Sequence, residues 1–101
     1  MFVVAAEFRI KPDRIEDFKK LIDWQADRSI AEEKGCVQFD VCQREDDPGA
    51  FLLYEVYTDA AAFDEGHMSV PRFEAFMSRA KSMMEGDPGI IRLNRLYANA
   101  K

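Results

Sequence analysis

The sequence predicts one α+β domain in which helices cover one face of a four-stranded antiparallel sheet. Three observations support this fold class: four runs carry the two-residue apolar period of a strand, two regions carry the period of a helix, and clusters of turn residues separate them. The chain has 101 residues, 48% of them apolar and 12% aromatic, which suffices for one hydrophobic core but not for two. Residues 1–101 are therefore expected to form a single domain.

The first part of the chain is expected to form a strand, a helix and a second strand. Apolar residues at every other position predict a strand over 2–10. Pro12 suits the first turn of a helix, and Gly35 suits the position beyond its end near Glu33. The apolar stripe of this helix consists of Ile15, Phe18, Leu21 and Ile22. Alternating residues then predict a strand over 36–44.

The second part begins with a hairpin turn rich in acidic residues, proline and glycine. A strand over 51–57 is followed by a helical region over 60–85, which Gly66 and Pro71 divide into a short and a longer helix. A further turn leads into a last strand over 90–97. The resulting order, β-α-β-β-α-β, is that of the ferredoxin-like fold.

The third predicted strand is apolar on both faces, which indicates a protein interface. One face carries Phe51, Leu53 and Tyr57, and the other carries Leu52, Tyr54 and Val56. Two helices cover only one face of such a sheet, so the other face would expose a large apolar patch. We expect a second copy of the chain to cover it in a homodimer with two-fold symmetry. The alternative is a monomer whose strands are merely rich in aromatic residues.

Charge and composition argue against several kinds of partner. The net charge is −5 and the basic residues are scattered among acids, so we expect no nucleic-acid binding. No apolar run approaches the ~20 residues that span a bilayer, so we expect no membrane segment. The first residues lack the basic start and the long apolar core of a signal peptide, which predicts a cytoplasmic location.

Cysteine spacing and sequence fingerprints predict neither a metal nor a cofactor. Cys36 and Cys42 lie six residues apart in one predicted strand, too far from each other to form a disulfide. No spacing of cysteine or histidine indicates a metal site. A glycine-rich phosphate loop and a flavin or nicotinamide fingerprint are also missing from the sequence. We therefore expect a small-molecule substrate and no cofactor.

The core-facing stripe of the first helix becomes polar toward the C-terminal end of that helix. Gln25 and Ser29 continue the stripe that begins with Ile15, Phe18 and Ile22. A polar residue that faces the core needs a partner, a water or a ligand, so Gln25 and Ser29 are candidates for lining a substrate cavity. The alternative is that this end of the helix emerges into solvent.

His67 is the only histidine, and it lies roughly in phase with the apolar residues of the second helical region. An imidazole titrates near neutral pH and can move a proton in either direction, so His67 is the candidate general base. The alternative is a structural or surface histidine at a helix end. Arg72 is a candidate for binding a carboxylate or phosphate, or else a solvated surface residue.

Glu55 is an acid in an otherwise apolar strand. Burial would raise its pKa toward that of a general base. The favoured interpretation is an ion pair with an arginine of the last strand, Arg92 or Arg95, or with an arginine of a dimer partner. Asp40 in the second strand has the same two interpretations.

Several short motifs occur in order along nearly the whole chain. They are Phe8-Arg9-Ile10-Lys11-Pro12, Ser29 ahead of Glu33 and Gly35-Cys36, Phe39-Asp40-Val41, Asp46-Asp47-Pro48, Tyr54-Glu55-Val56-Tyr57, and His67 ahead of Pro71-Arg72-Phe73. This ordered set resembles the antibiotic biosynthesis monooxygenase superfamily of dimeric α+β barrels. Haem-degrading members carry an axial histidine where this chain has residues 76–80, so the resemblance argues against haem. Arg72 stands where many relatives have a second histidine, which favours an anionic substrate.

Three functions remain open on this resemblance. The first is a cofactor-independent monooxygenase of a small phenolic or quinol-like substrate, in which His67 ionises the substrate, Ser29 and Arg72 orient its oxygens, and Glu55 tunes or positions a partner. The second is an isomerase of a small phosphorylated carbonyl compound, of the phospho-autoinducer-2 type, with Arg72 on the phosphate. The third is a non-catalytic dimer that binds a small ligand. The residues expected to complete the substrate site are Gln25, Phe39 and Tyr54.

Overall fold

The computed structural model describes residues 1–101, and its elements follow the predicted order. The strands are β1 (Phe2–Arg9), β2 (Cys36–Gln43), β3 (Ala50–Tyr57) and β4 (Gly89–Asn94). The helices are α1 (Ile15–Glu32), α2 (Ala60–Asp64) and α3 (Pro71–Ala80), with short 3-10 turns at Pro12–Arg14 and Lys81–Met83. None of these helices is long and apolar enough to cross a membrane.

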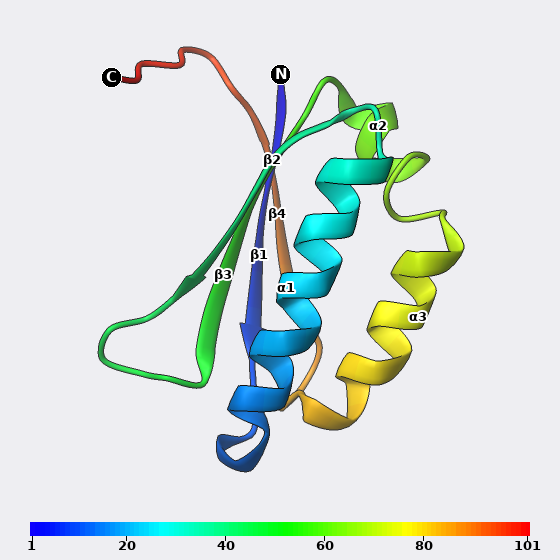
Figure 1. Cartoon of the computed structure of the whole chain (residues 1–101). Helices are drawn as coiled ribbons and strands as arrows, with labels where there is room; N and C mark the ends of the chain where they lie inside the picture. Colours follow the sequence, from blue (N-terminus) through cyan, green and yellow to red (C-terminus); the bar gives the residue numbers. More distant parts are fainter.

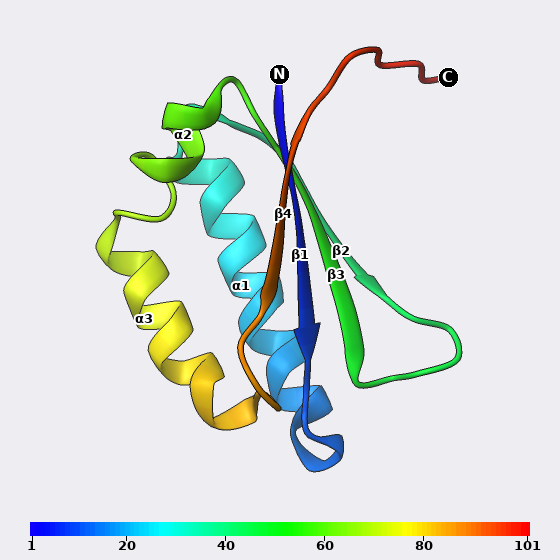
Figure 2. The same cartoon turned by 180° about the vertical axis from the view of Figure 1, so that it is seen from behind.

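The four strands form one antiparallel sheet in the spatial order β2-β3-β1-β4. All helices pack against one face of this sheet, and the chain leaves β4 as a tail that extends away from the body (Figures 1 and 2). The ferredoxin-like α+β fold predicted from the sequence is therefore confirmed.

The second long helix ends earlier than predicted. α3 stops at Ala80, whereas the sequence pattern extends to about Glu85. The reason is that the following residues pair with the end of β1: Met84 forms a β-bridge with Ile10, and the backbone N–H of Glu85 donates to the carbonyl of Arg9 at 2.8 Å. A helical backbone could not make these bonds.

The last strand is also shorter than predicted. β4 ends at Asn94, whereas the apolar pattern continues to Tyr97. Asn94 lies opposite Phe2, the first residue of β1, and only one backbone hydrogen bond follows, from Arg95 to the carbonyl of Met1 at 3.0 Å. Residues 95–101 form the tail instead.

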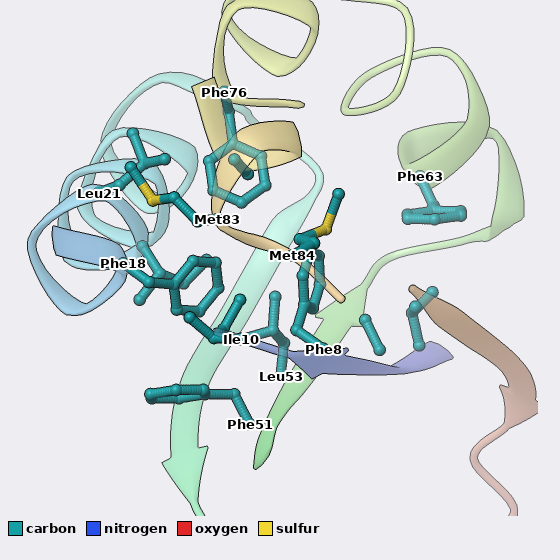
Figure 3. Packing of buried hydrophobic residues seen from close by; sticks show 14 of the residues in the cluster. Phe8, Ile10, Phe18, Leu21, Phe51, Leu53, Phe63, Phe76, Met83 and Met84 are labelled. Carbon is teal, nitrogen blue, oxygen red and sulfur yellow. The ribbon is translucent and has the colours of Figure 1, made fainter. Parts of the chain in front are cut away.

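Aromatic side chains pack with aliphatic residues and methionines to form the core between the sheet and the helices (Figure 3). The rings of Phe8, Phe18 and Phe51 pack in series, with centroids 5.5 Å and 5.0 Å apart, and Phe76 of α3 packs on Phe8 at 6.2 Å. Phe18 is fully buried. This packing anchors the first turns of α1 against the sheet and so fixes where its last turns lie.

The other face of the sheet has no helix over it. Two cross-strand rows of side chains lie there, Tyr54-Ala5-Ile91 and Val56-Val3-Leu93. Ile91 and Leu93 remain 46% and 44% exposed. We call these two rows the outer sheet face.

Candidate active site

One face of α1 carries buried polar side chains at successive turns. Gln25, Ser29 and Glu33 are four residues apart, the spacing that keeps side chains on one helix face. All three are buried. The hydroxyl of Ser29 donates to the backbone carbonyl of Gln25 at 2.8 Å, and Glu33 caps the C-terminal end of α1. This polar stripe (Gln25, Ser29 and Glu33) therefore faces the interior, as the cavity interpretation of the sequence requires.

Arg72, in the first turn of α3, binds all three residues of the polar stripe. Its guanidinium donates to Oε1 of Gln25 at 3.0 Å, to Oγ of Ser29 at 3.1 Å and to the carboxylate of Glu33. Arginine suits this position because its N–H groups form a rigid planar fork. Arg72 thus ties the first turn of α3 to the last turns of α1.

His67 lies in the loop between α2 and α3 and is 3% exposed. Its Nδ1 atom is 2.8 Å and 3.1 Å from the two carboxylate oxygens of Glu33. A carboxylate accepts hydrogen bonds, so Nδ1 carries a proton and Nε2 is the nitrogen that is left to exchange one. The aromatic rings packed around the imidazole belong to Phe39, Tyr57, Phe63 and Phe73.

Glu55 of β3 lies on the other side of the imidazole. Its Oε1 atom is 3.8 Å from Nε2 of His67 and accepts a hydrogen bond of 2.6 Å from the hydroxyl of Tyr57. Burial raises the pKa of Glu55 to about 7, and the Tyr57 hydrogen bond and His67 only partly oppose this effect. Glu55 can therefore take up or release a proton near neutral pH.

The pKa of Glu33 is shifted in the opposite direction. Burial favours its neutral form, but hydrogen bonds and charge from His67 and Arg72 together outweigh burial and lower the pKa of Glu33. The two carboxyl groups beside one imidazole thus have pKa values displaced in opposite senses. Such a separation is the pattern by which acid and base roles are recognised in active sites.

A cavity of about 190 Å³ lies between the sheet, α1 and α3. Its polar side chains are Gln25, Glu55 and His67, and the rest of the lining is apolar and rich in phenylalanine. An apolar cavity of roughly 150 Å³ is large enough to hold benzene, so this cavity fits a molecule with a single ring. No group of three or more His, Cys, Asp or Glu side chains is arranged to hold a metal ion.

The structure brings four of the predicted site residues together at this cavity. They are Gln25, Phe39, Glu55 and His67. Ser29 and Arg72 do not line the cavity. Both are hydrogen-bonded to Gln25, which lies between them and the cavity. Tyr54 lies on the outer sheet face, beside Ala5, and is separated from the cavity by the sheet.

The ion pairs favoured for Glu55 and Asp40 are wrong within this chain. Arg92 of β4 lies in the same cross-strand row as Glu55, but Val4 of β1 stands between them. Arg92 bonds Asp64 at 2.8 Å instead, and the basic group beside Glu55 is His67. Asp40 is exposed and accepts a hydrogen bond from a neighbouring glutamine side chain.

Sequence reasoning did not assign the contacts of Glu33 and Tyr57. A signal for each was present. Glu33 follows Ser29 by the same four residues that separate Ser29 from Gln25, so it extends the polar stripe. Tyr57 follows Glu55 by two residues and so shares its face of β3.

Comparison with known proteins gives the family. The model of the antibiotic biosynthesis monooxygenase family matches residues 1–79. An isomerase of (4S)-4-hydroxy-5-phosphonooxypentane-2,3-dione from Yersinia enterocolitica is 31% identical over 85% of this chain and 88% of its own length. The Bacillus subtilis protein YcnE, which is named as a monooxygenase, is 26% identical over 91% of this chain and 95% of its own.

One relative is longer than this chain. A Synechocystis protein is 30% identical over 81% of this chain, which spans only 54% of that protein. Among solved structures, a Nitrosomonas europaea protein named after antibiotic biosynthesis monooxygenases superposes with a TM-score of 0.89 and 27% identity, over 96% of this chain and 100% of its own. The chain therefore belongs to the antibiotic biosynthesis monooxygenase family.

Proposed function

We propose that the protein is a cofactor-independent monooxygenase that oxidises a small phenolic or quinol-like substrate with molecular oxygen. The observation that carries this proposal is the orientation of His67, whose Nδ1 is held by Glu33 while the ring lines an apolar cavity. A base in that position can ionise a bound phenol. Apolar walls accept dioxygen and exclude water from a reactive intermediate.

The reaction needs no electron donor other than the substrate. His67 removes the hydroxyl proton, and the electron-rich phenolate passes one electron to dioxygen. The two radicals join at a ring carbon that bears a hydrogen, next to or opposite the oxygen, and His67 returns its proton to give a hydroperoxide. His67 then takes the hydrogen of that carbon as a proton while the O–O bond breaks, and the released hydroxide accepts this proton. One phenol and one dioxygen thus become one quinone and one water.

Glu55 supports this cycle from beside the imidazole. Its carboxyl oxygen lies 3.8 Å from Nε2 of His67, and its pKa of about 7 keeps it available in both protonation states. When His67 becomes an imidazolium, an ionised Glu55 stabilises the charge. The Tyr57 hydroxyl holds the Glu55 carboxyl in place.

The second candidate is an isomerase of a phosphorylated carbonyl compound, which the similarity to the Yersinia enterocolitica enzyme favours. His67 would then move a proton between two substrate carbons. The lining of the cavity supports the first candidate better, because it contains no lysine and no arginine to bind a phosphate. The fork of Arg72, the expected phosphate ligand, is occupied by Gln25, Ser29 and Glu33.

The proposal includes a homodimer. The outer sheet face leaves Ile91 and Leu93 of the edge strand β4 nearly half exposed, and apolar rows of this kind usually mark an interface. A second copy related by a two-fold axis would match each row with its own equivalent.

An oxygen electrode tests the proposed reaction. Purified protein is supplied with simple phenols and quinols, and with phosphorylated hydroxyketones, in air and under nitrogen. The oxygenase consumes one dioxygen for each quinone formed and stops under nitrogen. Turnover that continues under nitrogen contradicts it and favours the isomerase, and ligand binding with no turnover of either class favours a binding protein.

The role of His67 is tested in the same assay with a built-in control for folding. His67→Gly should abolish oxygen uptake, and added imidazole, which fits the space left by the side chain, should restore part of it. Activity that survives the substitution removes His67 from the mechanism. A loss caused only by misfolding would not respond to imidazole.

A further inference from the structure

The side-chain amide of Gln25 has one satisfied end and one unsatisfied end. Its Oε1 atom accepts a hydrogen bond of 3.0 Å from the guanidinium of Arg72. Its Nε2 atom is buried and has no hydrogen-bond partner, the only buried side-chain nitrogen or oxygen atom of the chain in that condition. Gln25 is 1% exposed and lines the cavity. The unsatisfied donor, Nε2, therefore lies on the side of Gln25 that faces the cavity.

Arg72 fixes which end of the amide faces the cavity. A guanidinium only donates hydrogen bonds, so a flipped amide would place its N–H₂ group against the N–H groups of Arg72. Arg72 cannot turn away either, because it is also bonded to Ser29 and Glu33. Gln25 thus presents a donor to the cavity, and the arginine acts as a positioning residue.

A buried donor without an acceptor is unfavourable, and native proteins rarely leave one. The remaining cavity lining is largely apolar and does not satisfy it. The other polar groups of the lining have partners of their own. His67 is hydrogen-bonded to Glu33, Glu55 is hydrogen-bonded to Tyr57, and His67 and Glu55 lie 3.8 Å apart. The missing acceptor is therefore supplied from outside the protein.

We propose that Gln25 is the recognition residue of the cavity, and that Nε2 donates a hydrogen bond to a carbonyl or phenol-type oxygen of an uncharged, single-ring ligand. This assignment names the substrate class of the proposed monooxygenase and therefore rests on that proposed function. The binding itself can be measured without any reaction. The absence of a cationic side chain from the lining argues that the oxygen is not part of a phosphate or carboxylate. In this site the Gln25 amide orients the ring oxygen within the cavity that His67 also lines.

The test compares two ligands of the same shape, acetophenone and α-methylstyrene, which differ in carrying C=O or C=CH₂. Their affinities are measured by calorimetry or by ligand-detected NMR. We expect the wild-type protein to bind acetophenone about tenfold more tightly, as one net hydrogen bond in a dry site allows. Gln25→Leu should remove the difference, and Gln25→Glu, which keeps the oxygen toward Arg72 but replaces the donor by an oxygen, should weaken acetophenone alone.

Equal affinities in the wild type, no binding of either ligand, or a preference that survives in Gln25→Leu would overturn the proposal. A second measurement avoids the variants, in case they fail to fold. The chain has three glutamines, and Gln38 and Gln43 already donate from their side chains on the surface. In protein labelled with 15N-glutamine, acetophenone should shift one pair of side-chain amide signals, and an unchanged spectrum at saturation overturns the assignment.

The same data separate this inference from the proposed function. If acetophenone binds through Gln25 but no phenol or quinol is oxidised, the recognition residue stands and the oxygenase fails. If phenols are oxidised with one dioxygen each while Gln25→Leu keeps the wild-type KM, the oxygenase stands and the recognition residue fails.

Discussion

Glu33, at the end of α1, accepts a hydrogen bond of 2.8 Å from Nδ1 of His67, a residue that lies 34 positions further along the chain. The contact assigns the tautomer of the only histidine and directs its second nitrogen away from Glu33. Arg72 donates to the same carboxylate, so Glu33 stays ionised and the imidazole is held at a fixed angle. The base and the cavity that it serves are thus positioned by one buried carboxylate.

The first prediction follows from this contact. In Glu33→Gln, the amide can turn its N–H₂ group toward Nδ1 of His67, which moves the imidazole proton to Nε2 and removes the base. We expect kcat for oxygen uptake to fall by about 100-fold or more, the range found when a base or its orienting carboxylate is lost. KM should change much less, because Glu33 does not line the cavity.

Glu32→Gln is the matched control. Glu32 is the preceding residue of α1, is exposed, and makes only a surface ion pair with Arg28 at 3.4 Å. Exposed ion pairs contribute little to the free energy of unfolding, so this variant should keep both its activity and its stability. If Glu33→Gln is as active as Glu32→Gln, the carboxylate does not orient the base.

The second prediction concerns the pH dependence of stability. The pKa of Glu55 is about 7 in the folded protein, above its ordinary value of 4.5. Between these values the unfolded chain releases a proton that the folded protein keeps, so the free energy of unfolding falls as pH rises. The contribution of Glu55 is therefore full below pH 4.5, is lost progressively up to about pH 7, and then stays constant, with a total of about 3 kcal/mol at most.

Denaturant unfolding of the wild type and of Glu55→Gln, at a series of pH values from 4.5 to 8, measures this contribution as the difference between the two curves. As pH rises across this window, the free energy of unfolding of Glu55→Gln should increase relative to that of the wild type. Glu7→Gln, an exposed position of β1 on the outer side of the sheet, controls for removal of a carboxyl group and should show no such trend. A difference that is flat with pH would show that Glu55 is ionised throughout.

The fold was predictable because its signals are local. The two-residue period of the strands and the stripe of α1 depend only on neighbours in the sequence. The two boundaries that differ, at Ala80 and Asn94, are set by distant partners: Met84 pairs with Ile10, and Asn94 pairs with Phe2, the first residue of β1. Local periodicity carries no information about such partners.

The site was only partly predictable for the same reason. The inward stripe predicted Gln25 correctly as a cavity residue, since helix spacing alone places it there. The position of Arg72 depends on how α3 crosses α1, and it joins residues 47 positions apart in the chain. Its guanidinium was expected to bind substrate, and in the structure it donates hydrogen bonds to Gln25, Ser29 and Glu33.

The third prediction concerns assembly. Ile91→Glu places a charge on the outer sheet face, where Ile91 of the edge strand β4 lies beside Ala5. If a second copy covers that face, the wild-type protein should sediment with twice the chain mass of 11.6 kDa and the variant as a monomer. Trp24→Glu, on the exposed side of α1, is the control because it also replaces an exposed apolar residue and should leave the mass unchanged. A monomeric wild type would contradict the proposed dimer.

The last prediction tests the packing that carries the loop of His67. Gly35 lies between α1 and β2, where a Cβ atom would be 2.4 Å from Cβ of Ala62 and 3.2 Å from Oγ1 of Thr58. Gly35→Ala must therefore push α2 outward, and α2 leads directly into His67. We expect a loss of about 1–3 kcal/mol in the free energy of unfolding, typical of an overpacked site, together with a lower kcat.

A double-mutant cycle with Ala62→Gly identifies the cause. Ala62→Gly alone should destabilise by about 1 kcal/mol, since glycine is unfavourable within a helix. In the double variant the Cβ of residue 35 has the space that the Ala62 methyl occupied, so its destabilisation should be smaller than the sum of the two single changes. Recovery of oxygen uptake in the double variant would show that the displaced helix had moved His67. Strictly additive free energies would instead mean that the added methyl group of residue 35 is opposed by Thr58 and not by its contact with α2.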